Sequence, residues 1–496
     1  MQRLTGLDAT FLYLETPTSH MHVASCAVFD PSTVEDYSFD GVKQLVADRL
    51  HLLPPFRRRL VTVPFQLHHP LWIEDPDFDL DYHVRRAALP SPGGTEELAE
   101  FAAEVMGRPL DRSKPLWELW VLTGLEGGRI AYYNRVHHAC LDGVSGQAAV
   151  QAIMDETPDP RVVEAPPSSF WDTPARSSAM DLLSGALENL VKYQLRQATR
   201  TFDHADTVRR LWQRSIDPSR GLGAMTEGAP VTRFNRMVGS RRSYAVGELP
   251  LADVRSIGKA VGATLNDVFL AVCSGGLRSY LSRRGELPEK SLVAGCPVSL
   301  RKAGDTSLNN QVTMMLVSFA SDEPDPVKRL LKIAESSRQA KGVTADLAAS
   351  YDSDVALPWL PGLMGMAAGL SEAARLPELV PPAVLCNLVV SNVPGPRQQL
   401  YALGAKMLTH YPVSIPVHMQ AANITVQSYL DQLFFGITAC AEALPDPAVL
   451  RDDMLTAFAE IRGRVLKAPA VFAPREPAAS GRLLQSGPRP SESQAA

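Results

Sequence analysis

The spacing of hydrophobic and polar residues changes repeatedly along the first third of the chain. The run HVASCAVFD at 22–30 alternates as a strand does, whereas SFDGVKQLVADRLHLLPPF at 38–56 has helical spacing that ends at Pro54. A second helical run, EELAEFAAEVM at 96–106, is stopped by a glycine and a proline. LWELWVLTGLEGGRIAYYNRVHH at 116–138 then predicts a β-hairpin that turns at its Glu-Gly-Gly segment. This part of the chain is therefore predicted to be mixed α/β.

The same alternation returns after residue 242, where a strand and two helices are followed by further strands and a last helix at 446–467. A Pro/Ser-rich break at 158–174 precedes it, and from 468 a Pro/Ala/Ser/Gln composition without periodicity predicts disorder. We expect an N-terminal half at 1–165, a helical linker at 166–241, a C-terminal half at 242–467 and a tail at 468–496. Two α/β halves of similar size suggest a cleft between them.

Composition narrows the class of protein. A chain of 496 residues predicts two domains of roughly 200 residues each. The net charge of -5 gives no nucleic-acid footprint. Six cysteines without CxxC spacing predict reduced core thiols, with no metal framework. No apolar run reaches the ~18 residues needed to span a bilayer, and the start lacks a signal-peptide core, which predicts a cytosolic protein.

Two segments carry alternative interpretations. The run at 181–215 has helical apolar spacing with arginines and a lysine among it, so it is either a surface helix or a basic segment that rests on an anionic membrane. ALPWLPGLMGMAAGL at 356–370 is apolar, Met-rich and broken by prolines. It is either a buried connection or a lipid-facing mouth, since Met-rich surfaces adapt to variable apolar ligands.

The segment NRVHHACLDGVSG at 134–146 is the strongest candidate for chemistry. Neighbouring side chains on a strand point to opposite faces, so His137 and His138 are not expected to face one target together. A metal site would need both histidines, or His138 and Asp142 on one helix face, whereas Asp142-Gly143 suggests a turn into a helix. We therefore expect no metal.

A single histidine is more often a core residue than a base, but here it belongs to a composite His-His-x-x-x-Asp-Gly pattern at a strand end. Such a histidine can reach a cleft, and its pKa near neutrality suits proton abstraction from a hydroxyl. We interpret His138 as the general base and His137 as a supporting residue. Asp142 is expected to turn inward, pair with a buried arginine and hold the loop.

HHACLDG matches the HHxxxDG signature of CoA-dependent acyltransferases and peptide-synthetase condensation domains. The wider chain resembles the bacterial wax ester synthase/acyl-CoA:diacylglycerol acyltransferase family from about residue 4 to 467. The resemblance is carried in the family's order by RLTGLDATFLYLETP, PPFRRRL, DFDLDYHV, PLW, LNDVFLAV, PVSLR and SNVPGP.

The resemblance implies two chloramphenicol-acetyltransferase-like domains with a cleft between them. It also implies transfer of a long-chain acyl group from acyl-CoA to diacylglycerol, or to a long-chain alcohol to give a wax ester. Acyl-CoA is then a co-substrate, no cofactor is bound, and the enzyme contacts a membrane or lipid droplet peripherally.

The resemblance assigns further residues to the site. Gly143, Asn266 and Asp267 are expected at the substrate, although Asn266 and Asp267 are also good helix caps. Pro115, Leu116 and Trp117 are expected to shape or buttress the pocket. Arg301 is the candidate partner of Asp142, with a solvated arginine as the competing interpretation. No serine or cysteine nucleophile is required, so Cys140 is not expected to be acylated.

Two other functions stay open at this point. One is a condensation-type enzyme that uses carrier-protein thioesters, which shares HHxxxDG. The other is a non-catalytic, lipid-binding member of the family.

Overall fold

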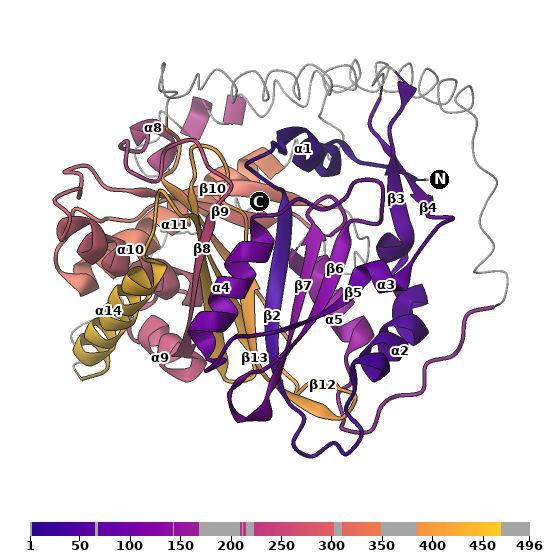
Figure 1. Cartoon of the computed structure of the whole chain (residues 1–496). Coiled ribbons are helices and arrows are strands. Elements are labelled where there is room, and N and C mark those ends of the chain that lie inside the picture. The colour runs from indigo at the N-terminus through magenta and orange to yellow at the C-terminus, as the bar shows by residue number, and fades with distance from the viewer. Residues whose placement is uncertain are drawn as a thin grey trace, which may run out of the picture.

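Two six-stranded sheets stand side by side in the computed structural model of the chain (Figure 1). The structure describes residues 2–64, 68–141, 143–167, 209–210, 212–214, 223–301, 310–348 and 384–467. The first sheet has the strand order β12-β13-β2-β7-β6-β5, and the second has β10-β9-β11-β14-β15-β8. A small separate sheet has the order β1-β4-β3.

The strands have these bounds: β1 Gln2–Arg3, β2 His22–Asp30, β3 Arg58–Val61, β4 Leu71–Glu74, β5 Val84–Ala88, β6 Trp117–Thr123, β7 Ile130–His137, β8 Arg242–Pro250, β9 Val293–Ser299, β10 Val312–Ser318, β11 Leu388–Val393, β12 Tyr401–Ala402, β13 Ala405–Val413, β14 Ala422–Tyr429 and β15 Gln432–Cys440. The helices are α1 Gly6–Leu14, α2 Phe39–Arg49, α3 Leu80–His83, α4 Thr95–Met106, α5 Gly143–Ile153, α8 Ala224–Glu227, α9 Leu251–Val261, α10 Leu265–Ser282, α11 Pro326–Ala348 and α14 Pro447–Lys467, with short 3₁₀ turns at Leu50–Leu52, Pro54–Arg57 and Glu126–Gly128.

Strand β7, which leads into the His-His segment, lies in the interior of the first sheet. It pairs antiparallel with β2 on one side and with β6 on the other, and all its residues except Asn134 are buried. Burial on both faces explains the apolar and aromatic residues of its first half, IAYY, because helices cover each side of the sheet. The His-His segment therefore begins at the end of a strand that is fixed by neighbours on all sides.

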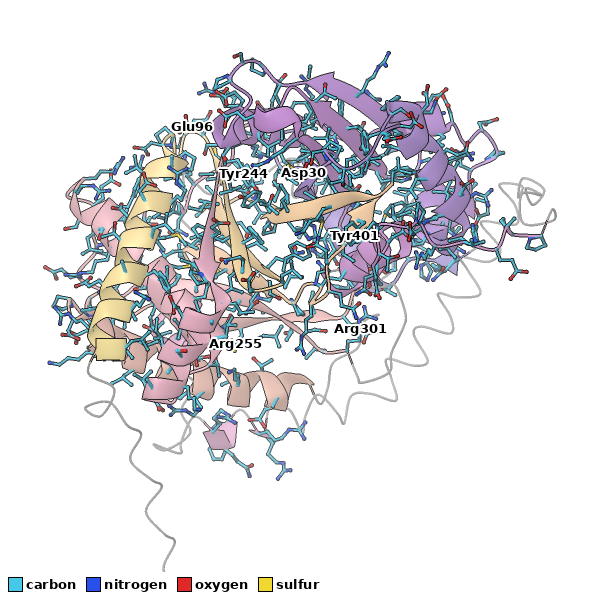
Figure 2. The ribbon with its side chains drawn as sticks, turned by 90° about the horizontal axis from the view of Figure 1, so that it is seen from below. Asp30, Glu96, Tyr244, Arg255, Arg301 and Tyr401 are labelled. Atoms are coloured by element: carbon cyan, nitrogen blue, oxygen red, sulfur yellow. The ribbon has the colours of Figure 1, made fainter. Side chains whose placement is uncertain are left out.

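The second half of the chain completes the first sheet. Strand β13 pairs antiparallel with β2, placing Ala27 opposite His410, and it also packs against β14 and β15 of the second sheet. The two sheets approach closely here, since a Cβ built on Gly436 of β15 would stand 2.0 Å from the Pro412 carbonyl oxygen. Figure 2 shows Tyr401 of β12 beside the first half of the molecule and Arg301 near the boundary between the halves.

Helices cover the sheets in separate layers. Side chains of α2 and α5 pack in one core on one face of the first sheet, while α4 packs on the opposite face together with Tyr244 and Val246 of β8. Helices α9, α10, α11 and α14 share the large core of the second sheet. Each half therefore has its own core, and α4 with β8 joins them.

The predicted mixed α/β fold is confirmed, as is the hairpin of β6 and β7, whose turn places Gly127 and Gly128 at positive φ. All six cysteines are buried with free thiols, as expected. The segment boundaries at 165, 241 and 467 stay predictions, and the run at 356–370 lies outside the described residues. Over the part of the chain that is described, no single helix is long and apolar enough to cross a membrane; only the bent pair α9 and α10, taken together, meets that criterion.

Candidate active site

His137 is the last residue of β7, and both of its ring nitrogens face protein groups. The side chain is 1% exposed. Its Nδ1 accepts a hydrogen bond from the Ala139 backbone N–H (3.1 Å), so the ring proton resides on Nε2, which lies 3.4 Å from Glu15 Oε2. His137 thus holds the turn that follows it and is itself held by Glu15.

Glu15 is fixed from two sides. Arg112 Nε donates to Glu15 Oε2 at 3.1 Å, and the same oxygen lies 3.4 Å from His137 Nε2. Burial alone would raise the pKa of Glu15, but the contact with His137 and the charge and hydrogen bond of Arg112 outweigh it and lower this pKa to about 2. The carboxylate is therefore ionised at any physiological pH.

His138 lies in the turn and is only half-buried, in contrast to His137. Its ring stacks on Phe11 with centroids 4.1 Å apart. Its backbone N–H donates to the Met21 carbonyl (2.8 Å), and its carbonyl accepts from the Asn310 side-chain amide (2.7 Å). The loop is thus anchored at its backbone, while the imidazole packs on an aromatic face.

Asn310 links this loop to helix α1. It is fully buried, and both its backbone N–H and its side-chain amide donate to Asp8 Oδ1, at 2.9 and 2.7 Å. Burial raises the pKa of Asp8, although the hydrogen bonds from Asn310 and Thr5 act in the other direction. A residue far along the chain therefore ties the His138 carbonyl to a buried carboxyl group.

Asp8, Phe11 and Glu15 follow one another at helical spacing, i, i+3 and i+7, so they share one face of α1 and its C-terminal cap. Through Asn310, His138 and His137 respectively, these three side chains secure the His-His segment. None of them, nor Asn310, was singled out by sequence analysis, although Asp8, Phe11 and Glu15 lie within the quoted run RLTGLDATFLYLETP. The sequence signal that could have identified them is the spacing of Asp8, Phe11 and Glu15, which puts two acidic residues and an aromatic residue on one face of a mostly apolar helix.

In the predicted PLW block, Leu116 contacts the loop and Trp117 lines a cavity. The Leu116 carbonyl accepts from the His137 backbone N–H (2.9 Å), and Pro115 and Leu116 are buried. Trp117 donates through Nε1 to the Phe56 carbonyl (2.7 Å), and its ring stacks on Phe56 and His83.

Contacts connect the start of α5 to the second half of the molecule. A Cβ built on Gly143 would stand 3.3 Å from Cγ2 of Val393 at the end of β11. The neighbouring Asn392 contacts Asn266 at 3.4 Å, and Arg301 reaches Ser145 of α5, also at 3.4 Å. The structure thus brings Gly143, Asn266 and Arg301 to one region, whereas Asp142 lies outside the described residues.

Asp267 makes the hydrogen bonds of a helix cap. Its Oδ2 accepts from the backbone N–H of Thr264 (2.8 Å) and from its hydroxyl (2.7 Å), which completes a capping box at the start of α10. The helix-capping interpretation therefore describes its contacts.

Two other kinds of chemistry, a cysteine nucleophile and a bound metal, depend on the side chains that the structure describes. Burial, together with the nearby Asp8, raises the pKa of the Cys140 thiol, which makes it a poor nucleophile. Within the described ranges, no group of three or more His, Cys, Asp or Glu side chains could hold a metal ion.

Two family models match most of the chain. Residues 4–269 match the model of the wax ester synthase/diacylglycerol acyltransferase catalytic domain, and residues 308–462 match that of the WS/DGAT C-terminal domain. The chain belongs to the wax ester synthase/diacylglycerol acyltransferase family.

Individual relatives extend over nearly the whole chain. The O-acyltransferase WSD of Acinetobacter baylyi is 36% identical over 459 residues, which cover 90% of this chain and 93% of that protein. The solved wax ester synthase/diacylglycerol acyltransferase of Marinobacter aquaeolei VT8 superposes with a TM-score of 0.64 at 30% identity, covering 94% of this chain and 100% of that one. The first condensation domain of the calcium-dependent antibiotic synthetase shares the fold (TM-score 0.56, 15% identity, 93% of this chain and 96% of that one).

The Asp8–Asn310–loop connection leads to a pH-dependent prediction. Asn310→Ala removes the side-chain hydrogen bonds to the Asp8 carboxyl and to the His138 carbonyl but keeps the backbone N–H bond to Asp8, which should cost roughly 1–3 kcal/mol at neutral pH. Because the folded-state pKa of Asp8 is already raised, its ionisation opposes folding as pH rises above its unfolded value of about 3.9. Losing Asn310 raises that pKa further, so the stability deficit should grow between about pH 4 and pH 7.

Denaturant unfolding at several pH values measures this, and Asn387→Ala is the matched control. Asn387 is equally buried, but its partners are the Pro230 carbonyl, the Val293 N–H and the Asn235 amide, so its loss should not depend on pH. If both variants show the same pH dependence, the Asp8 link does not act as described.

Proposed function

We propose that this chain transfers a long-chain acyl group from acyl-CoA to the hydroxyl of diacylglycerol, giving triacylglycerol, and that long-chain alcohols can replace diacylglycerol to give wax esters. The observation that carries the proposal is the contrast between the two histidines in a chain of this family. His137 is fully buried, with Nδ1 hydrogen-bonded to the Ala139 N–H and Nε2 3.4 Å from Glu15 Oε2, whereas His138 is half-buried at the head of the turn.

In the proposed mechanism His138 acts as the general base. It takes the proton of the acceptor hydroxyl while that oxygen bonds to the thioester carbonyl carbon. As the carbon–sulfur bond breaks, protonated His138 returns the proton to the leaving thiolate, so the products are the ester and free CoA. The transfer is direct, with no acyl-enzyme intermediate.

The other residues act on position and binding. We propose that His137 orients the loop and that Asp142 holds it through Arg301. The contact of Arg301 with Ser145, three residues after Asp142, supports that pairing. Gly143, Asn266 and the PLW block then border the substrates, and Asn266 is the candidate polar contact to the reacting carbonyl. The proposal gives Asp267 a capping role beside them.

The activity is tested with long-chain acyl-CoA and either diacylglycerol or a long-chain alcohol, and separately with carrier-protein thioesters and amines. His138→Ala should lower CoA release by about 10²–10⁴-fold, because the general base is lost, while the melting temperature stays near that of the wild type. Cys140→Ala, in the same loop, is the matched control and should retain activity.

Wild-type rates in His138→Ala would remove this residue from the mechanism. Product formation from carrier-protein thioesters alone would instead identify a condensation-type enzyme, and failure with every substrate would favour a non-catalytic lipid-binding protein.

We further propose peripheral contact with the inner face of a membrane or with lipid droplets, because acceptor and product both partition into lipid. The run at 181–215 lies mostly outside the described residues. Near its end, one residue is buried against the protein and others are exposed. Arg214 is buried and pairs with Asp346 of α11 (2.8 Å), while Trp212 is 64% exposed and Arg209 is also exposed. Arg214 would anchor the segment, and an exposed tryptophan beside arginines suits a lipid interface.

Replacing Arg196, Arg200, Arg209 and Arg210 with glutamine should reduce flotation with anionic vesicles at least tenfold at low salt, since each contributes roughly 1 kcal/mol at such a surface. The control replaces four exposed arginines outside this run, Arg241, Arg338, Arg462 and Arg464, which changes the net charge equally. Equal loss in both variants, or no flotation of the wild type, would contradict a specific membrane-binding segment.

A further inference from the structure

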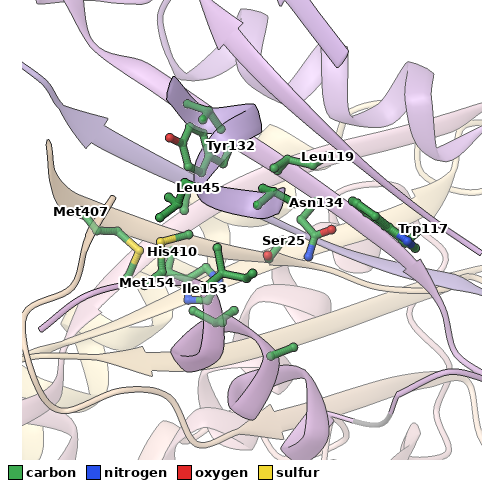
Figure 3. Close-up of a pocket in the computed structure, with 15 residues that line it drawn as sticks. Ser25, Leu45, Trp117, Leu119, Tyr132, Asn134, Ile153, Met154, Met407 and His410 are labelled. Atoms are coloured by element: carbon green, nitrogen blue, oxygen red, sulfur yellow. The ribbon is translucent and has the colours of Figure 1, made fainter. Parts of the chain in front are cut away.

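A cavity lies between the first sheet and the helices α2 and α5 (Figure 3). Its helical wall is wholly apolar, from Val42 and Leu45 of α2 to Val150 and Ile153 of α5, with Met154 just beyond. No Asp, Glu, Lys or Arg is among the residues that line it. Such a lining suits an uncharged hydrocarbon chain and disfavours a carboxylate or a phosphate, which would be left without a counter-charge.

The sheet side of this cavity carries a polar row. Asn134 of β7 and Ser25 of β2 are direct partners in the antiparallel register, and Figure 3 shows their side chains next to each other. Neither side chain makes a hydrogen bond to any residue that the structure describes, and both are half-buried against the cavity. Polar groups in an otherwise apolar site fix which ligand binds there, because leaving them unpaired costs free energy.

His410 of β13 adds a donor at the same cavity. The Gln427 side-chain amide donates to His410 Nδ1 (2.6 Å), so Nε2 carries the ring proton. Burial lowers the pKa of His410 to about 4, so the imidazole is neutral at physiological pH. The cavity therefore offers an amide, a hydroxyl and a neutral imidazole, and it bears no charge.

The cavity adjoins the candidate active site. Trp117 of the PLW block lines it, and α5, its wall, begins at Gly143 directly after the His-His segment. Asn134 lies three residues before His137, the last residue of β7, which places the two positions roughly 10 Å apart along the strand. His137 has the opposite parity and turns instead to Glu15.

We propose that this cavity binds an uncharged hydrocarbon chain that carries an oxygen function, a hydroxyl or a carbonyl, and that Asn134 and Ser25, with His410, bind that oxygen. That this hydrocarbon chain is part of a substrate rests on the proposed function. The oxygen then belongs either to an oxygenated acyl chain of the donor or to an ester carbonyl of diacylglycerol, a group that a plain fatty alcohol lacks.

The test is a competition-binding assay on the full chain with neutral probes. In one arm, octadecanols with the hydroxyl at different carbons are compared with octadecane, which carries no oxygen; in the other, diacylglycerol is compared with the dialkyl ether analogue, which lacks the ester carbonyls. The wild type should prefer the oxygen-bearing ligand of at least one arm by about 3–10-fold, the contribution of one or two hydrogen bonds.

Asn134→Leu should abolish that preference and tighten binding of the plain chain, and Ser25→Ala should reduce the preference. Ile153→Val is the matched control: it trims the apolar wall, so both ligands should weaken alike and their ratio should persist. The arm that shows the preference identifies the source of the oxygen.

The proposal is overturned if the wild type shows no preference in either arm, as a cavity that holds only water would, or if the preference survives in both Asn134→Leu and Ser25→Ala. These outcomes are independent of turnover. If the protein transfers acyl groups but shows no binding preference, the proposed function holds and the proposed cavity ligand is wrong. If it shows the preference but no turnover, the cavity ligand is right and the proposed function is wrong.

Discussion

The contact between Glu15 and His137 is the constraint on which the arrangement of the candidate site depends. With Nδ1 of His137 accepting from the loop and Nε2 facing an ionised carboxylate, the ring has one tautomer and one orientation. That fixed imidazole ends β7 and begins the turn, which puts the next residue, His138, against Phe11 on the other side. Two adjacent histidines thus have different environments because a strand end separates their faces.

The site is also a junction between the two halves of the molecule. Asn310 reaches from the second half to the His138 carbonyl and Asp8, and Arg301 and Val393 approach the start of α5. Strand β13 contributes His410 to the first sheet, where Gln427 of the second sheet holds it. The loop and the cavity beside it therefore need both halves in place, and neither half alone would form them.

Local sequence predicted much of this fold because its signals are local. The alternation of β2, the capped helical runs of α2 and α4 and the glycine turn of the β6–β7 hairpin all appear where periodicity placed them. The His-His segment was also found, because its residues are contiguous. Strand β13 was missed, since its partner β2 lies almost four hundred residues earlier in the chain. The same holds for Asn310, whose role exists only through Asp8 and His138, distant in sequence and adjacent in the fold.

The most direct test of this account is the steady-state kinetics and thermal stability of Glu15→Gln, with Glu104→Gln, which pairs with Arg108 on the exposed surface of α4, as the control. Losing the buried charge beside His137 and Arg112 should cost roughly 1–3 kcal/mol of stability at neutral pH. At a temperature where the variant is folded, kcat for acyl transfer should fall at least tenfold while KM for acyl-CoA is unchanged, because Glu15 contacts the loop through His137 and is held by Arg112. Wild-type kcat and melting temperature in Glu15→Gln would contradict the claim that this contact sets the geometry of the site.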